Sequence, residues 1–371
     1  MTCHLTSAGT PMCPLRPMAL LSALLMPLVV MAQTPPPASP VTVYGILDLG
    51  LRRADGLTAQ YAGSNSRTTG LISGIDNTSR LGLRGAEDLG GGLKAVFQLE
   101  TGLNAHNGTP INRSKFFDRA AWLGLQQDGS TWTAGRQTTV LADAVAMTEP
   151  LGMRLASFNP NINVTALSQH GLGQQYGNAG TPNGAFRLDQ SLKYTGRVGP
   201  WIGRAMYGLG QQDADHTGMS SSGLGLGYST NAWVISGALQ TFKSTDHLQL
   251  DAASLGTSHQ WGPLKLVANI GRYSAETQPG RHTTQRVLSV GGTWAISPQL
   301  DLTAAHYRVD RRRTGLSDDG YTRQVVFAEH KLSRRTRLYA EVDLTRWRKG
   351  YAGDTVRPRA TGWSAGWVHS F

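Results

Sequence analysis

Residues 361–371 read Thr361-Gly-Trp-Ser-Ala-Gly-Trp-Val-His-Ser-Phe371, and apolar side chains recur there at alternate positions. Trp363, Ala365, Trp367 and Phe371 share one face of an extended chain, and the residues between them are mostly small or polar. This pattern is typical of a transmembrane β-barrel, whose outer face carries aromatic residues at the membrane interfaces and whose closing strand must pair. We therefore expect a barrel that needs Phe371 for its assembly. An ordinary sandwich strand is the alternative.

The N-terminal segment predicts export. Residues 18–31 form an apolar run that follows Arg16, and the Val-Met-Ala at 30–32 fits a small-residue cleavage site. These features predict a signal peptide at residues 1–32, because the run is shorter than the ~20 residues of a spanning helix. Residues 33–40 are rich in proline and are expected to form an extended tether.

The composition argues against a soluble domain with a dry core. Mean hydropathy is −0.26, and the chain contains 45 Gly, 9 Trp and 11 Tyr. Hydrophobicity spread over alternate positions is what a barrel with a water-filled lumen requires. Both cysteines, Cys3 and Cys13, lie in the predicted signal peptide, so we expect no disulfide and no thiolate metal site. We also expect no cofactor. Loss of Arg16 lowers the formal net charge from +11 to +10, and export argues against a nucleic-acid partner.

Turn signals divide the chain into sixteen strands. Clusters of Gly, Pro, Asn, Asp and Ser suit tight reversals, and they occur at 88–92, 128–130, 198–200, 229–231, 261–263, 297–299 and 333–335. Longer polar stretches alternate with these turns, at about 53–77, 104–115, 138–186, 212–219, 243–247, 275–283, 311–321 and 348–359. Barrels of ~16–18 strands leave an aqueous channel, with short periplasmic turns and long extracellular loops. Fourteen or eighteen strands are the alternatives.

The connection at residues 138–186 is much longer than the others. Loops longer than ~15 residues usually carry function, and the lumen is the space that an open barrel offers such a segment. We expect this connection, which includes Asp143, Glu149, Arg154 and His170, to narrow the bore. A long and variable surface loop is the alternative.

Residues 79–100, SRLGLRGAEDLGGGLKAVFQLE, resemble the second strand, turn and third strand of the general porins of Gram-negative bacteria, and are most similar to those of β-proteobacteria. Further similar segments lie at 41–48, 119–125, 133–137, 332–340 and 366–371, so the resemblance covers nearly all of residues 41–371. It implies an all-β protein, a 16-stranded antiparallel transmembrane β-barrel of the outer membrane. It also implies a homotrimer, a third loop folded into the pore, and passive diffusion of small hydrophilic solutes.

Alternation places arginines of the second strand on the lumen face. Leu81 and Leu83 share one face, so Arg80 and Arg84 share the other. A charge on the lipid face costs about 2–4 kcal/mol at mid-membrane. The arginine face is therefore predicted to line the lumen.

Neighbouring strands supply further predicted wall arginines. In the first strand Leu49 and Leu51 point outward, which leaves Arg52 inside. If Trp122 faces lipid, Arg119 faces the lumen.

The resemblance also assigns charges to the narrowest part of the pore. Similar porins place a basic ladder opposite acidic groups of the third loop. Arg80 and Arg119 match the ladder, and Asp143 and Glu149 match the loop acids. The predicted basic wall is completed by Arg52, Arg84, Arg136 and Arg187, and a solvated or interface charge is the alternative for the last three.

The predicted function is an outer-membrane porin that prefers anions, because basic charge is in excess on the inferred wall. We expect it to contact outer-membrane lipid, lipopolysaccharide and the barrel-assembly machinery, and to pass small anions and hydrophilic solutes. An outer-membrane barrel enzyme of the lipase or protease type is one alternative. A non-conducting structural or adhesive barrel is another. We expect no enzymatic activity, since no Ser-His-Asp set or metal-ligand spacing stands out.

Overall fold

The computed structural model describes residues 41–58, 61–155, 158–161, 186–210, 218–244, 247–353 and 356–371. The signal peptide predicted at 1–32, the tether at 33–40 and His170 lie outside these residues, and both segment assignments stay predictions. The described part is almost entirely β-structure, with one α-helix, α1 (Val140–Met147). No described helix is long and apolar enough to cross a membrane.

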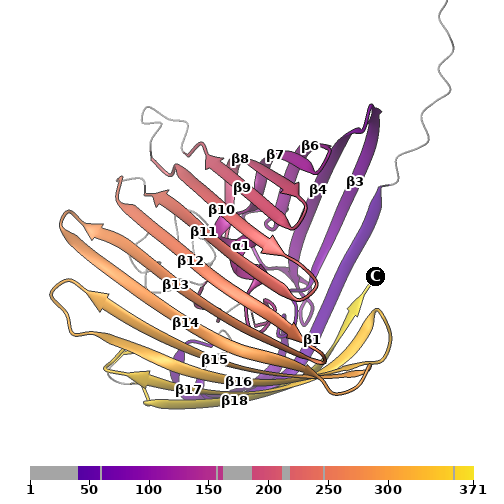
Figure 1. Ribbon diagram of the computed structural model, residues 1–371. Helices are drawn as coiled ribbons and strands as arrows, with labels where there is room; N and C mark the ends of the chain where they lie inside the picture. Colours follow the sequence, from indigo (N-terminus) through magenta and orange to yellow (C-terminus); the bar gives the residue numbers. More distant parts are fainter. Residues whose placement is uncertain are drawn as a thin grey trace, which may run out of the picture. The chain divides into compact units, whose positions relative to one another are not determined.

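The strands form one antiparallel sheet that closes on itself (Figure 1). They are β1 (Thr42–Leu57), β2 (Gly63–Ser73), β3 (Arg80–Gly90), β4 (Leu93–Asn104), β5 (Thr109–Pro110), β6 (Ala120–Gln127), β7 (Ser130–Thr138), β8 (Arg187–Val198), β9 (Trp201–Gly208), β10 (Ser221–Ser229), β11 (Trp233–Lys243), β12 (Gln249–Trp261), β13 (Leu264–Gln278), β14 (Arg281–Ala295), β15 (Leu300–Arg313), β16 (Asp319–Lys331), β17 (Thr336–Arg348) and β18 (Arg359–Ser370). Closure occurs where β1 pairs with β18, from Ile46 opposite Ser370 to Asp55 opposite Thr361. A closed sheet leaves no strand edge unpaired in the membrane.

β2 and β3 together occupy one position in the barrel. Along the same edge of β1, Leu49 pairs with Ser73 of β2, and Ile46 pairs with Arg80 of β3. Residues 74–79 therefore interrupt a single strand position. The two-residue β5 is a short addition that pairs with β4. The described strands thus fill sixteen barrel positions, which confirms the predicted sixteen-stranded antiparallel barrel.

The seven predicted short turns all separate consecutive barrel strands, but two predicted long connections are wrong in extent. β1 continues to Leu57 and β2 begins at Gly63, well inside the stretch predicted as a loop at 53–77. Likewise, β13 and β14 are separated only by residues 279–280. The physical reason is that strands extending beyond the membrane meet water on both faces. Polar residues can pair there, and the apolar alternation stops before the strand does.

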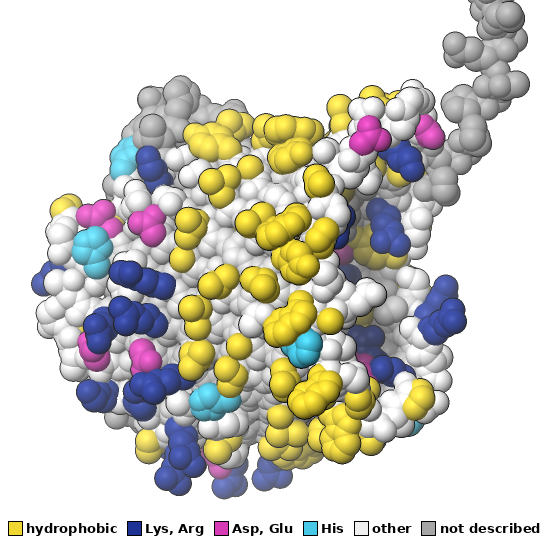
Figure 2. Space-filling model, viewed as in Figure 1, with side chains coloured by type: hydrophobic (Ala, Val, Ile, Leu, Met, Phe, Trp, Pro, Cys, Tyr) yellow, Lys and Arg dark blue, Asp and Glu magenta, His cyan; other side chains and the backbone are white. Residues whose placement is uncertain are grey.

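Burial alternates along the strands and distinguishes the two faces of the wall. On β1, Leu47 and Leu51 are 43% and 41% exposed, whereas Asp48 and Arg52, which follow them directly, are fully buried. Exposed apolar side chains continue around the outer face, and Figure 2 shows them as a hydrophobic band. The lipid and lumen faces predicted for the first and second strands are therefore as expected.

Small residues of β18 allow side chains of β1 and β17 to meet over its inner face. Arg52 of β1 reaches Asp343 of β17 at 2.8 Å, and a Cβ at Gly362 would lie only 2.5 Å from each of these side chains. Tyr339 of β17 donates a 2.8 Å hydrogen bond to Asp48 of β1. The Tyr339 hydroxyl would lie 2.5 Å from a Cβ at Gly366. A Cβ at Gly366 would also lie 2.5 Å from the Leu49 carbonyl oxygen, so glycine is required there, whereas a side chain at position 362 would have to displace the ion-paired ends of Arg52 and Asp343.

Candidate functional site

Arg80 and Arg119 lie on either side of one carboxylate. The Nε of Arg119 is 2.6 Å from Oε1 of Glu100, and Nη1 of Arg80 is 3.9 Å from the same oxygen. Tyr44 donates a 2.8 Å hydrogen bond to the other oxygen of Glu100. Arg80 also donates to Asn77 at 3.0 Å. The structure therefore brings together the two arginines predicted to form the basic ladder, with Glu100 between them.

Trp122 does not face lipid, so the premise that placed Arg119 inside was wrong. Trp122 pairs directly with Gln98, an inward-facing residue of β4, whereas Leu123 of β6 is 64% exposed. Trp122 therefore shares the inner face. Arg119 precedes the first residue of β6, and its contact with Glu100, rather than strict alternation, directs it inward.

Arg136 and Arg187 extend the same group of cations, although Arg187 is only 7% exposed and its assignment to the water-exposed wall therefore needs correction. The Nε of Arg187 donates to the backbone carbonyl of Arg119 at 2.7 Å, and the Nε of Arg136 donates to the backbone carbonyl of Asp118 at 2.6 Å. Arg136 also forms a 2.7 Å ion pair with Asp189, which Lys115 contacts as well. We call Arg80, Arg119, Arg136 and Arg187 the arginine cluster. It joins β3, β7, β8 and the residues before β6.

The other two predicted wall arginines lie apart from the arginine cluster. Arg84 is exposed, and its guanidinium lies 5.1 Å from the centre of the Tyr44 ring. Arg52 is fully buried and forms ion pairs with Glu341 at 3.2 Å and Asp343 at 2.8 Å. The assignment of Arg52 to the water-exposed pore wall therefore needs correction. A buried arginine must satisfy its charge with acids, and this one does so at the barrel closure.

Asp143 is positioned by the start of α1. Thr139 caps the helix by accepting a 3.1 Å hydrogen bond from the Ala142 N–H, and an acidic residue in the first turn is favoured by the helix dipole. Asp143 lies 2.9 Å from Nζ of Lys193 and 4.0 Å from Nε of Arg204. Its nearest cations are thus on β8 and β9, and not in the arginine cluster.

Sequence reasoning missed both of these cations. Leu192 and Tyr207 are about half exposed on the outer face. Alternation from these residues would have placed Lys193 and Arg204 inside. The signal was present, but the predicted wall was traced only through the first strands.

Glu149 lies in a different environment from Asp143. It is only 4% exposed, accepts a 2.8 Å hydrogen bond from the Met153 N–H and contacts the Tyr307 hydroxyl of β15. Burial raises the pKa of Glu149, although these hydrogen bonds act in the opposite direction. The assignment of Glu149 to an acidic surface facing the water of the bore therefore needs correction, because its carboxyl group fastens the connection to the barrel wall.

A second ion network joins the same connection to the interrupted strand. Arg154 forms ion pairs with Asp76 at 2.8 Å and Glu329 at 3.0 Å. Arg337 of β17 contacts the same two acids at 2.7 and 3.0 Å. The Leu155 N–H also donates to the Ile75 carbonyl at 2.9 Å. Asp76 was not predicted, because residues 53–77 were interpreted as a surface loop.

The described part of the connection contacts inward-facing residues of several other strands. Helix α1 packs against β9, β10, β11 and β12, and in Figure 1 it lies behind these strands. Thr148 accepts a 3.1 Å hydrogen bond from Asn269 of β13. Beside this segment is a polar cavity of about 570 Å³, whose lining includes Arg154, Lys265, Asp301 and Arg337.

Residues 19–350 match the family model of Gram-negative porins. The chain belongs to this family. This porin is accordingly an outer-membrane channel protein, and the proteins that it resembles are channels rather than enzymes.

Individual relatives and structures agree with the family. The porin is 26% identical over 344 residues to outer membrane porin protein 32 of Delftia acidovorans, which covers 90% of each chain. It is 36% identical over 140 residues to an outer membrane porin protein of Bordetella pertussis. That match spans 34% of this chain and 36% of the Bordetella protein. Among solved structures, an anion-selective porin from Comamonas acidovorans superposes with a TM-score of 0.74 at 22% identity, covering 90% of this chain and all of that one.

Proposed function

We propose that this porin forms a water-filled pore for the passive diffusion of small hydrophilic solutes and ions, with a preference for anions. The observation that carries the proposal is the arginine cluster on the inner face of a closed sixteen-position barrel. Barrels of ~16 strands have an aqueous lumen, and fixed charge acts strongly inside a narrow, low-dielectric wall.

The arginine cluster retains an excess of positive charge. Two of its guanidinium groups donate to backbone carbonyls, of Asp118 and Arg119, which carry no net charge. Glu100 is shared between two arginines, and Asp189 is shared between Arg136 and Lys115. A carboxylate shared by two cations cannot neutralise both. The resulting field favours anions, and the Comamonas protein that shares this fold is an anion-selective porin.

We further propose that the connection at 138–186 narrows the pore and that Asp143 supplies negative charge at the constriction. Glu149 holds the described residues of the connection to the inner side through a contact with Tyr307. Arg154 does the same through ion pairs with Asp76 and Glu329. Asp143 is 22% exposed and so can act on ions in water. Acid on the connection and base on the wall create a transverse field that orders water and favours polar solutes.

Homotrimeric assembly, contact with lipopolysaccharide and insertion by the barrel-assembly machinery complete the proposal. The resemblance to general porins supports each of them. The trimer is tested by the mass of the detergent-solubilised protein before and after heating. A monomer in mild detergent would contradict it.

A planar lipid bilayer tests the pore itself. Purified, folded protein should produce discrete conductance steps, and a KCl gradient should give a reversal potential with the sign of chloride preference. Liposomes that contain the protein should swell in small sugars. A sealed bilayer, with folding confirmed by resistance of the barrel to detergent at room temperature, would refute the channel. A reversal potential with the sign of cation preference would refute the proposed anion preference but not the proposed pore.

A further inference from the structure

We propose that the outer face of β12, β13 and β14 holds a binding site for a phosphorylated, acylated glycolipid of the outer leaflet, the lipid A part of lipopolysaccharide. The site combines an apolar hollow with two arginines at one end. It lies on the lipid-facing side of the wall and is distinct from the pore, and it rests on the lipopolysaccharide contact included in the proposed function.

The hollow has a volume of about 520 Å³ and an amphipathic lining. Leu255, Ile270 and Leu288 supply exposed apolar side chains, and Ala253 supplies a small one that leaves room between them. Arg272 and Arg286 line the same hollow. An acyl chain fits the apolar part, and a phosphate group fits the arginines.

The two arginines lie directly opposite each other on neighbouring strands. Arg272 of β13 pairs in register with Arg286 of β14, and both are exposed. Like charges in directly opposite positions destabilise a sheet. Within the described part of the chain, neither side chain forms an ion pair or a hydrogen bond. A phosphate between them would satisfy both charges with bidentate hydrogen bonds.

The acid nearest in register is already occupied. Asp310 of β15 also lines the hollow and lies opposite Arg286, but it forms a 2.9 Å ion pair with Arg308 and also contacts Arg348. Two arginines therefore already share this carboxylate, and Arg286 and Arg272 follow it on the next two strands without an acid of their own among the described residues. In Figure 2, Lys and Arg side chains gather on the left of the view beside the hydrophobic band. Charge complementarity thus calls for an anion.

The position along the strands identifies the leaflet. Arg272 and Arg286 lie towards residues 279–280, on the same rim as the long connections, whereas Ile270 and Leu288 lie one step nearer the short turns. Long loops of outer-membrane barrels are extracellular. The arginines therefore lie where head groups of the outer leaflet are expected, and an arginine there costs only ~0–1 kcal/mol.

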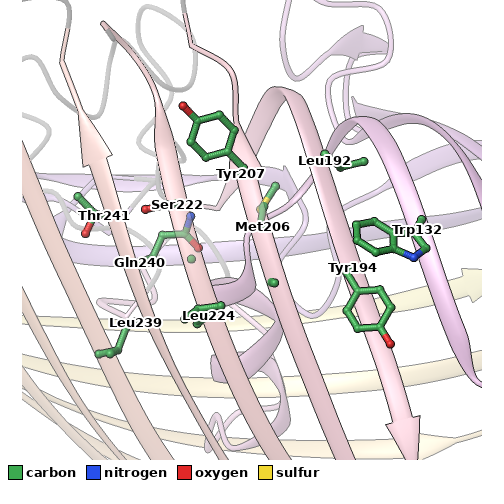
Figure 3. A pocket seen from close by; sticks show the side chains of 12 residues that line it. Trp132, Leu192, Tyr194, Met206, Tyr207, Ser222, Leu224, Leu239, Gln240 and Thr241 are labelled. Carbon is green, nitrogen blue, oxygen red and sulfur yellow. The ribbon is translucent and has the colours of Figure 1, made fainter.

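Another hollow on the outer face provides an internal comparison. It lies on β7 to β11 and is lined by Trp132, Leu192, Tyr207 and Leu224 with other uncharged residues (Figure 3). Its volume is similar, at about 530 Å³. An acyl chain can occupy either hollow, but only the one at Arg272 and Arg286 can also bind a phosphate.

The test measures lipid binding to the purified, delipidated full-length porin by native mass spectrometry. The probes are bisphosphorylated lipid A, its dephosphorylated form and phosphatidylglycerol. The Arg272→Gln/Arg286→Gln variant should bind bisphosphorylated lipid A about tenfold more weakly or worse, because two charge-assisted contacts are lost. Ala253→Trp, which fills the hollow without changing charge, should also weaken binding.

The matched control is Arg334→Gln/Arg335→Gln, which removes two exposed arginines from the opposite rim. It should leave lipid A binding within about twofold of wild type. Unchanged binding by the Arg272/Arg286 variant would overturn the proposal, and so would an equal loss in the control. If phosphatidylglycerol bound as tightly as lipid A and depended equally on the two arginines, the site would bind anionic lipids in general, and the assignment to lipid A would be wrong. The conductance of each variant in a planar bilayer confirms that it is folded. Loss of the lipid-binding proposal can therefore be distinguished from loss of the proposed channel function.

Discussion

The Nε of Arg187 donates a 2.7 Å hydrogen bond to the backbone carbonyl of Arg119. Arg187 is the first residue of β8 and follows the long connection directly, so this bond fixes the end of the connection to the wall beside Glu100. Arg187 is only 7% exposed, and Glu100 and Asp118 act on its charge. The bond therefore gives Arg187 a positioning role within the arginine cluster.

The first prediction concerns ion selectivity. Replacing Arg80 and Arg119 by Gln leaves Glu100 without its two cations, so the permeability ratio of chloride to potassium should fall by roughly threefold to tenfold. The reversal potential in a KCl gradient measures this change. Arg312→Gln/Arg346→Gln removes the same charge from exposed positions and should have a much smaller effect. A larger effect in that control would move the selectivity filter away from the arginine cluster.

The second prediction concerns Asp143. Asp143→Asn should strengthen the preference for chloride, because Lys193 and Arg204 lose the acid that they contact. The expected change is in the opposite direction to that of the arginine double variant. Asp251→Asn, an exposed acid of β12, is the matched control for loss of one negative charge. If Asp143→Asn reduced chloride preference, the acid would not oppose the wall cations.

The third prediction concerns the anchor of the connection. Arg154→Met removes ion pairs to Asp76 and Glu329 and should destabilise the anchored state by about 1–3 kcal/mol, since Arg337 still contacts both acids. Single-channel recordings should then show larger or more variable conductance steps. Arg154→Lys, which keeps the charge, should behave more like the wild type. Identical traces for all three proteins would mean that this network does not restrain the connection.

The fourth prediction concerns pH. Burial raises the pKa of Glu149 above its ordinary value, so the folded protein holds this proton more tightly than the unfolded chain. The stabilisation from protonated Glu149 is complete below the ordinary pKa and is lost as pH rises through the raised one. Glu149→Gln should remove this part of the pH dependence while its amide oxygen still accepts hydrogen bonds. Melting temperature in detergent, measured from acidic to neutral pH, checks the change. Parallel curves for wild type and variant would contradict it.

The fifth prediction concerns Phe371. Its N–H and C=O exchange 3.1 Å hydrogen bonds with Gly45, and its ring covers that glycine. Deletion of Phe371 should reduce the yield of heat-resistant oligomers, whereas Phe371→Tyr should assemble nearly normally. Electrophoresis of membranes with and without heating measures both. Normal assembly of the deletion variant would show that β18 closes the barrel without this residue.

Local sequence patterns predicted most of the fold. The turns around residues 262–263 and 332–335 were predicted from their own Gly, Pro and Ser residues. Alternation along a single strand was enough to place Leu51 and Arg52 on opposite faces of the barrel wall. Within the arginine cluster, alternation correctly predicted the face of Arg80, whereas Arg119 was supported by the family resemblance and not by a correct alternation argument. Such signals lie within a few residues of one another, and a single sequence contains them.

The contacts that could not be predicted join residues far apart in the chain. Arg52 meets Glu341 across 289 positions, so its burial depends on how β1 and β17 approach over β18. Asp76 meets Arg154 only because residues 74–79 interrupt a strand. Alternation predicts the face of a side chain, but it contains no information about which charge lies opposite. Arg52 was therefore assigned to the pore wall and Glu149 to the acidic loop facing it, whereas both side chains are buried in contacts that hold the barrel and the connection together.

The glycines of β18 have a consequence for fidelity. A slip of one residue in a strand turns every side chain to the opposite face. Were β18 to pair with β1 one residue out of register, Trp363 or Trp367 would replace Gly362 or Gly366 beneath the Arg52–Asp343 pair and the Tyr339 hydroxyl. At Gly366 even a Cβ would lie 2.5 Å from the Leu49 carbonyl oxygen, so an indole cannot fit there, and at Gly362 an indole would have to displace the Arg52–Asp343 ion pair. The alternation of glycine and tryptophan along β18 therefore favours one register with β1 and disfavours closure of the barrel by a misaligned strand.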